Sequence, residues 1–196
     1  TMQLLANGEL YITGHGDQGQ QADGANTDRA YFHKVNFPSN AGRVRYIVSN
    51  SSTNGDVAVS CMVLMEDGDL YSWGYGVNGA LGLGNVTNYN TVQKVSYFDK
   101  NVKSCHMSGG DYSSVVAITN DNKVHTWGYN GYGQLGKGNT TTIYNGPAEI
   151  EVSGQIPVKA LMTGSGSYGT LCVLMRSGRV YICLLYTSDA ADDSDC

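Results

Sequence analysis

The sequence predicts an all-β protein assembled from repeated units, and three observations support this class. The 196-residue chain has 26 glycines and 14 tyrosines but only 15% charged residues, a composition that favours short strands and tight turns. A β-branched run followed by an alternating run recurs along the chain. Glycine-rich stretches follow these runs, and so many glycines disfavour a helix there.

Two segments carry the repeat most clearly. One begins at Leu64 and reads LMEDGDLYSWGYGVNGALGLGN, and the other begins at Ile118 and reads ITNDNKVHTWGYNGYGQLGKGN. From the two tryptophans onward they align without a gap, and the aligned residues form the predicted structural motif. Its members are Gly68 at the turn of the earlier segment and the pairs Trp73 and Trp127, Gly74 and Gly128, Gly79 and Gly133, Leu81 and Leu135, Gly82 and Gly136, and Gly84 and Gly138.

Two weaker copies flank these segments. The copy near the start has Thr13 in place of the tryptophan and Gln21 in place of the leucine. A fourth copy begins at Cys172, reads CVLMRSGRVYI and then stops matching. The turn residues of the four copies are 60, 54 and 56 residues apart, a spacing at the upper end of the range for propellers and solenoids; they are Gly8, Gly68, Asn122 and Gly178.

Each copy predicts a β-hairpin. Residues 115–118 form a β-branched run, residues 120–122 are typical of a turn, and residues 123–127 alternate between polar and apolar side chains. We expect a two-residue turn between the strands. Leu70, Val124 and Val180 should lie on equivalent strands, and Trp73 and Trp127 should occupy the same position in their blades.

At these residues the chain resembles the repeat of the RCC1 (regulator of chromosome condensation) family, best over residues 122–139. The resemblance implies a β-propeller, because family members form seven blades of four strands each around a central channel. About three units and a truncated hairpin predict an open arc rather than a closed ring. We expect this propeller fragment at residues 1–182, with repeats at about 1–58, 59–112, 113–168 and 169–182.

The end of the chain departs from the repeat. Residues 183–193 resemble the translation of a transposase-type sequencing adapter, so we expect residues 183–196 to be a non-native tail; the alternative is a natural acidic tail. Without its four aspartates, 13 acidic residues face 12 basic ones. The densest basic cluster, Lys34, Arg43 and Arg45, is too small to predict a nucleic-acid partner. No run of about 18 apolar residues predicts a membrane span, and localisation is left open.

Several constellations could indicate chemistry, and each has a structural explanation. Residues 131–136 match the G-x-G-x-x-G dinucleotide fingerprint, but the residues after them do not predict the required helix. The four histidines share no short spacing, and Cys61, Cys105 and Cys172 are expected to be buried, reduced thiols. Ser113 and Ser114 lie where a turn precedes the buried strand. We therefore predict no catalytic residue, cofactor or metal.

The sequence thus favours a non-enzymatic scaffold that binds a protein partner through propeller loops. Tyrosine provides large contact area at low entropic cost, so the candidate contacts are Tyr75, Tyr129, Tyr132 and Tyr144. The alternatives are a phage tail-fibre or bacterial surface adhesin module and, as the resemblance implies, a guanine-nucleotide exchange factor for a small GTPase. An incomplete propeller is also expected to self-associate through its uncovered blade faces.

Overall fold

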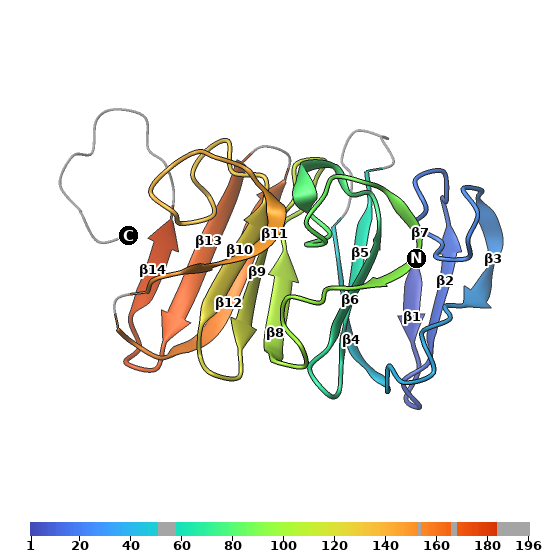
Figure 1. Ribbon diagram of the computed structural model, residues 1–196, viewed down its shortest axis with the longest axis horizontal. Helices are drawn as coiled ribbons and strands as arrows, with labels where there is room; N and C mark the ends of the chain where they lie inside the picture. Colours follow the sequence, from blue (N-terminus) through green and yellow to red (C-terminus); the bar gives the residue numbers. More distant parts are fainter. Residues whose placement is uncertain (51–57, 153, 166–167, 184–196) are drawn as a thin grey trace.

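The computed structural model describes residues 1–50, 58–152, 154–165 and 168–183. Within them, fourteen strands form four antiparallel sheets, which stand side by side in Figure 1. The first sheet has three strands: β1 (Met2–Leu4), β2 (Leu10–Gly14) and β3 (Arg29–Lys34). The second has four: β4 (Val44–Ser49), β5 (Ser60–Met65), β6 (Leu70–Gly74) and β7 (Tyr89–Lys94).

The third and fourth sheets continue the series. The third contains β8 (Val102–Met107), β9 (Ser114–Thr119), β10 (Val124–Gly128) and β11 (Ile143–Ile150). The fourth contains β12 (Pro157–Ser165), β13 (Tyr168–Met175) and β14 (Val180–Cys183). Strand β4 contacts β8, and β8 contacts β12, so these inner strands meet while β7 and β11 form the outer edges of their sheets. The fold is an open, partial β-propeller, as predicted.

The predicted hairpins recur in register. Leu70, Val124 and Val180 each begin the second hairpin strand, where they pair with Leu64, Ile118 and Leu174 respectively. Trp73 and Trp127 are both fully buried at the same place in their sheets. The expected equivalence of these positions is confirmed.

The turn between the hairpin strands is one residue longer than predicted. Met65 donates its amide to the carbonyl of Asp69 (2.9 Å), and Gly68 donates to the carbonyl of Met65 (3.1 Å), so three residues lie between the paired ends. The third of them has a positive φ in every copy: Gly8 (81°), Gly68 (91°), Asn122 (63°) and Gly178 (85°). This left-handed residue forms the bulge that a three-residue hairpin loop needs, which explains why only Gly or Asn stands there.

Helical structure is nearly absent from the described residues. One 3-10 turn, η1 (Val77–Gly79), lies in the glycine-rich loop after β6, and Asn78 within it has φ 64°. The glycine-rich stretches are therefore mostly loops, as their glycine content predicts. In the described part of the chain, no helix has the length and apolar character that crossing a bilayer requires.

Each tryptophan joins its sheet to the preceding one. Trp73 Nε1 donates to the carbonyl of Gln20 (2.8 Å), and Trp127 Nε1 donates to the carbonyl of Ala80 (3.0 Å). A Cβ on Gly82 would lie 2.9 Å from Trp127 Nε1, so only glycine permits this approach. Gly136 stands in the same relation to Cys183, whose sulfur would lie 3.0 Å from such a Cβ. Cys183 thus occupies the position of the missing fourth tryptophan.

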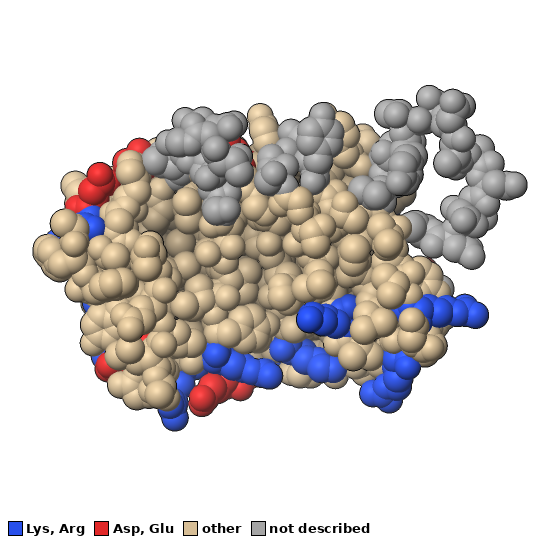
Figure 2. Space-filling view, turned by 180° about the vertical axis from the view of Figure 1, so that it is seen from behind, with Lys and Arg blue, Asp and Glu red and all other residues tan. Residues whose placement is uncertain are grey.

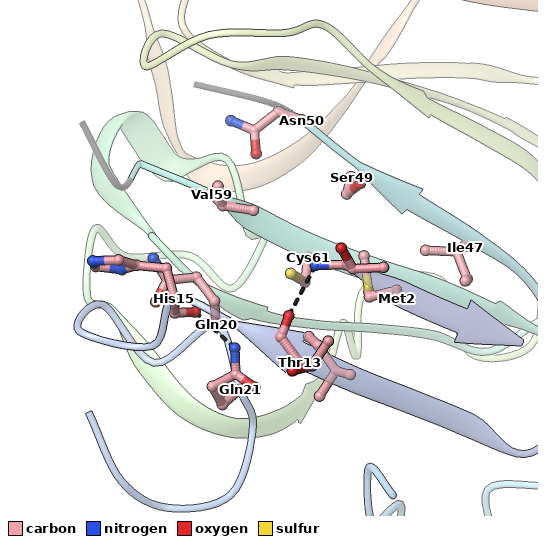
Figure 3. A pocket seen from close by; sticks show the side chains of 12 residues that line it. Met2, Thr13, His15, Gln20, Gln21, Ile47, Ser49, Asn50, Val59 and Cys61 are labelled. Atoms are coloured by element: carbon pink, nitrogen blue, oxygen red, sulfur yellow. Dashed lines mark hydrogen bonds between the residues drawn. The ribbon is translucent and has the colours of Figure 1, made fainter. Parts of the chain in front are cut away.

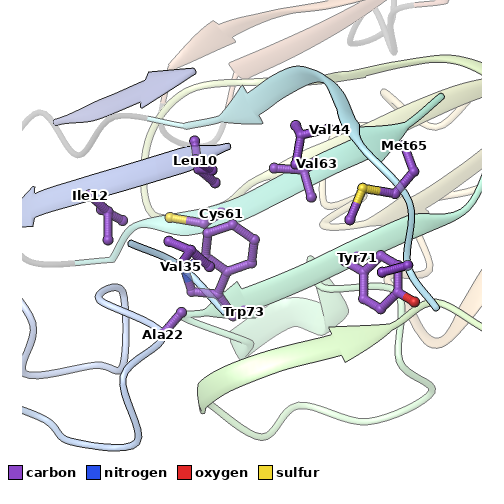
Figure 4. Close-up of a cluster of buried hydrophobic side chains, with 11 residues drawn as sticks. Leu10, Ile12, Ala22, Val35, Val44, Cys61, Val63, Met65, Tyr71 and Trp73 are labelled. Atoms are coloured by element: carbon purple, nitrogen blue, oxygen red, sulfur yellow. The ribbon is translucent and has the colours of Figure 1, made fainter. Parts of the chain in front are cut away.

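Apolar cores fill the spaces between successive sheets. Figure 4 shows the first core, in which Leu10 and Ile12 from β2 face Val63 from β5 and Trp73 from β6. Phe37, from the segment after β3, packs edge-on against Trp73, with ring centroids 6.2 Å apart. Phe98, from the equivalent segment after β7, packs against Trp127 at 5.8 Å. The segments that link the sheets therefore contribute to the cores.

The sheets are offset from the sequence repeats by one strand. The period that begins near residue 59 contains β5, β6 and β7 of the second sheet and also β8, the inner strand of the third. Apart from Cys183, which ends β14, the predicted tail of residues 183–196 lies outside the described residues. Each sequence period therefore contributes strands to two neighbouring sheets.

In the part of the chain that the structure describes, no other sheet covers the face of the fourth sheet that points away from the third. Leu64 and Ile118 are fully buried in the second and third sheets, whereas the equivalent Leu174 is 37% exposed. Leu70 and Val124 are buried in the same way, whereas Val180 is 57% exposed. For the same reason Cys172, which we expected to be buried, is only half-buried. The arc is open at this end.

Candidate functional site

The two ends of the sheets differ in character. At one end, which we call the loop end, lie the glycine-rich loops and the connections from each inner strand to the next strand. The hairpin turns lie at the opposite end, which we call the turn end. A groove of about 390 Å³ crosses the loop end, and we call it the tyrosine groove; it is lined by Gln18, Ala58, Tyr75, Val77, Asn78, Asp111 and Tyr112.

Three tyrosines gather at this groove. Tyr75 and Tyr112 line it, although they belong to different sheets. Tyr129 packs against Tyr112, with ring centroids 4.7 Å apart and planes inclined at 48°. Tyr112 is 44% exposed, so its ring is accessible from solvent while the stacking limits its freedom.

Hydrogen bonds hold the backbone beneath these rings. Ser60 Oγ donates to the carbonyl of Tyr75 (2.6 Å), and Ser114 Oγ donates to that of Tyr129 (2.7 Å). The amides of the same tyrosines donate to Val59 and Ser113, each at 3.0 Å. The anchoring is the same in both repeats. It holds the backbone that carries the aromatic side chains in the absence of a partner.

Asn50 fastens the loop that carries Tyr112. Its buried Nδ2 donates to the carbonyls of Ala58 (2.9 Å) and Gly110 (2.8 Å) and lies 2.7 Å from Ser113 Oγ. Its Oδ1 accepts from the amide of Ser60 (2.7 Å). A single amide side chain thus ties the second sheet to the β8–β9 loop of the third.

The other two candidate tyrosines lie apart from the groove. Tyr132 is 41% exposed in the loop after β10, and Tyr144 is 47% exposed on β11. A Cβ on Gly79 would lie 2.9 Å from the Cα of Tyr144, so the backbone at Tyr144 packs against the loop of the preceding sheet. The structure thus brings Tyr75 and Tyr129 together through Tyr112 and leaves Tyr132 and Tyr144 outside.

A second cavity, of about 360 Å³, lies between the first two sheets (Figure 3). Met2 lies on one wall and Ile47 and Ser49, from the inner strand β4, on another. Strands β5 and β9 correspond to β1 in the second and third sheets. Each of them pairs with an inner strand, β4 or β8, whereas β1 has no such strand beside it among the described residues. Burial raises the pKa of the Cys61 thiol in this cavity to about 12, so it is protonated and a poor nucleophile.

The remaining constellations show structural roles where they are described. Ser113 Oγ donates to the carbonyl of Gly110 (2.9 Å), so both its hydroxyl and that of Ser114 bond to backbone. Residues 131–136 form a loop that runs to β11 without a helix. Within the described ranges, no three His, Cys, Asp or Glu side chains gather as a metal site would require.

Sequence reasoning missed several residues that build the loop end. Neither Tyr112 nor Asn50 was among the predicted contact residues. The glycine-rich loops are closed by a side chain twelve residues downstream: Asp28 accepts from the Gly16 amide (3.0 Å), Asn88 from the Gly76 amide (2.8 Å) and Thr142 from the Asn130 amide (3.3 Å). Alignment of the repeats could have found this set, because a short polar residue recurs there.

Comparison with known proteins agrees with this architecture. The chain is 26% identical over 170 residues to the human E3 ubiquitin-protein ligase HERC2, covering 87% of this chain and 3% of that protein. It is 28% identical over 190 residues to the mitochondrial RCC1 domain-containing protein RUG3 of Arabidopsis thaliana, covering 89% of this chain and 40% of that protein. The chain thus spans less than half the length of these relatives.

Solved structures share the fold. Human WBSCR16 aligns with a TM-score of 0.70 and 20% identity, covering 92% of this chain and 44% of that one. Yeast RCC1 (Prp20), solved with Kap60 bound to it, aligns with a TM-score of 0.67 and 18% identity, covering 92% of this chain and 39% of that one. The model of the regulator of chromosome condensation (RCC1) repeat matches residues 67–117 and 121–173, more than half of the sequence. The chain belongs to the RCC1 repeat family.

Proposed function

We propose that this chain is a non-enzymatic scaffold that binds a partner protein through the tyrosine groove at its loop end. The observation that carries the proposal is the grouping of Tyr75, Tyr112 and Tyr129 over a rigidly anchored backbone. Partly exposed aromatic side chains that are already ordered can bury large area at little entropic cost. That yeast RCC1 (Prp20) was solved with Kap60 bound to it supports protein binding by such propellers.

The groove chemistry favours a side chain with an apolar body. Tyr75, Tyr112 and Val77 provide apolar surface, while Gln18 and Asn78 provide amide groups and Asp111 a carboxylate. No lysine or arginine lines the groove among the described residues. A partner peptide with an aliphatic or aromatic residue beside hydrogen-bond donors would match this lining.

Peptide selection followed by mutation tests the proposal. Peptides selected from a random library against the whole chain should bind the Tyr112→Ala and Tyr75→Ala variants at least about tenfold more weakly, as expected for aromatic hot spots. Tyr31→Ala is the matched control, because Tyr31 is 63% exposed on the first sheet and does not line the groove. Equal affinity for the Tyr112→Ala variant and the unmodified chain, measured by calorimetry, would contradict the proposal.

A further inference from the structure

The turn end of the molecule carries a second feature, formed by basic residues far apart in sequence. Arg45, Lys103 and Lys159 lie near the starts of β4, β8 and β12, and all three are exposed. Since these inner strands contact one another in series, the three cations lie on neighbouring strands at the same end. Figure 2 shows Lys and Arg side chains gathered along the lower edge of the molecule.

The same backbone irregularity occurs at each of these positions. The register of β4 against β5 shifts between Val44 and Tyr46, that of β8 against β9 between Val102 and Ser104, and that of β12 against β13 between Pro157 and Lys159. Arg45 and Lys103 are therefore the extra residues of equivalent β-bulges, and Lys159 directly follows the third. Bulges direct side chains away from the ladder, and they are enriched at the rims of sheets next to binding sites.

Several basic residues of the turn end have carboxylate partners, and these three cations do not have one among the described residues. Lys100 and Lys123 bond to Asp67 and Glu149, at 3.1 and 2.9 Å. Among the described residues no ion pair involves Arg45, Lys103 or Lys159, nor the exposed Arg176 and Arg179 at the turn between β13 and β14. Burial lowers the pKa of His106 on β8, and the positive charge of Lys159 lowers it further. The field of Lys159 therefore reaches the neighbouring inner strand.

We propose that this basic rim, formed by Arg45, Lys103, Lys159, Arg176 and Arg179, binds an acidic, Asp- or Glu-rich segment of a partner protein. Five exposed cations that form no ion pair with the described residues attract negative charge and accelerate encounter. A short acidic peptide fits better than a nucleic acid, because the rim has five cations with exposed carboxylates beside them, Asp99, Asp121 and Glu151, and so offers fewer than the roughly six to ten phosphate contacts of a typical nucleic-acid site. Among the described residues, the exposed aromatic side chain of the turn end is Tyr97, which packs against Phe98 and His125 and belongs to none of the inner strands that carry the rim.

Fluorescence anisotropy with a labelled deca-glutamate peptide and the whole chain tests this proposal at low salt. The Lys103→Glu/Lys159→Glu variant should bind the peptide about tenfold more weakly, because two attractions become repulsions. Lys137→Glu is the control: it makes one such charge reversal, where the test variant makes two, at an exposed lysine of the loop end, and its affinity should stay within about twofold of the unmodified chain. Binding should also weaken as salt rises.

Three results would overturn the proposal. They are an unchanged affinity in the double variant, an equal loss in the Lys137→Glu variant, and tighter binding of a single-stranded oligothymidylate that carries the same number of charges as the peptide. If circular dichroism shows that the double variant is unfolded, Lys103→Gln/Lys159→Gln replaces it, and a loss of about threefold is then expected. Because the rim and the tyrosine groove lie at opposite ends, Tyr112→Ala should leave peptide binding unchanged.

Discussion

At the scale of single residues, His125 shows how one repeat position is filled in two ways. It stands on β10 where Tyr71 stands on β6, and it is almost fully buried. Its ring packs edge-on against Tyr97 and Phe98, with centroids 5.5 and 5.2 Å away. Its Nδ1 has no hydrogen-bond partner among the described residues, so the environment favours the neutral imidazole.

Acidification should therefore destabilise the fold through His125. Burial lowers the pKa of His125 and Lys123 lowers it further, although Glu149 and Asp121 oppose the shift. The unfolded chain then binds more protons, so stability is complete above about pH 6.5 and is lost as the pH falls toward the folded-state pKa. In urea titrations at pH 7.5 and 5.5, the denaturation midpoint should fall more for the unmodified chain than for His125→Tyr. Equal decreases would show that His125 is not responsible.

At the scale of the element, the glycine-rich loop joins one sheet to the next. Trp127 inserts into the loop of the second sheet, where its Nε1 bonds to Ala80 and its ring lies against Gly82. Trp73 makes the corresponding bond to Gln20 in the first sheet. The glycine-rich loop of each unit therefore packs against the tryptophan of the following unit. This contact explains why the glycines and the tryptophan recur together.

Substitution of two glycines in equivalent loops can separate this close approach from backbone strain. Gly82 and Gly138 both have a positive φ, 71° and 67°, but only Gly82 faces the tryptophan; a Cβ on Gly138 would meet no atom within 4 Å. Gly138→Ala should cost about 1–2 kcal/mol of unfolding free energy from the left-handed backbone. Gly82→Ala should cost about 1–3 kcal/mol more, because the indole must move. Equal losses of unfolding free energy in urea titrations would contradict the proposal that Gly82 makes room for the indole of Trp127.

At the scale of the whole molecule, the open arc leaves a sheet face without a neighbour. Three exposed apolar residues of the fourth sheet occupy positions that are buried in the second and third sheets; they are Leu174, Val180 and Ile182. Burial of such a contiguous face is favourable by about 25 cal/mol per Å² of apolar area. The chain therefore has a driving force for association that a blade with neighbours on both sides lacks.

We expect the 196-residue chain to self-associate through this face. Sedimentation velocity should show a mean sedimentation coefficient that rises with protein concentration, and Leu174→Glu should reduce the rise, because a carboxylate on the face resists burial. Val86→Glu provides the control, since Val86 is 49% exposed but lies in the loop between β6 and β7. A chain that stays monomeric at all concentrations, or an equal effect of both substitutions, would contradict this prediction.

The sequence by itself determined the local units of this protein. Hairpin strands and paired tryptophan and glycine positions follow from periodicity and backbone preference within about 20 residues, so alignment of the repeats was enough to predict them. The turn length differed by one residue because a two-residue type I′ loop needs a positive φ at both of its residues, whereas Asn122 has a positive φ and the preceding Asp121 does not.

Only the tertiary structure decided how distant residues meet. Strand β8 pairs with the sheet of the following period, Asn50 bonds to Gly110 some sixty residues away, and Tyr112 joins Tyr75 in one groove. In the same way, Arg45, Lys103 and Lys159 look isolated along the chain and become neighbours through the inner strands. The physical reason is that local preference sets the conformation of each strand, whereas contacts between sheets depend on how the blades pack around a common axis.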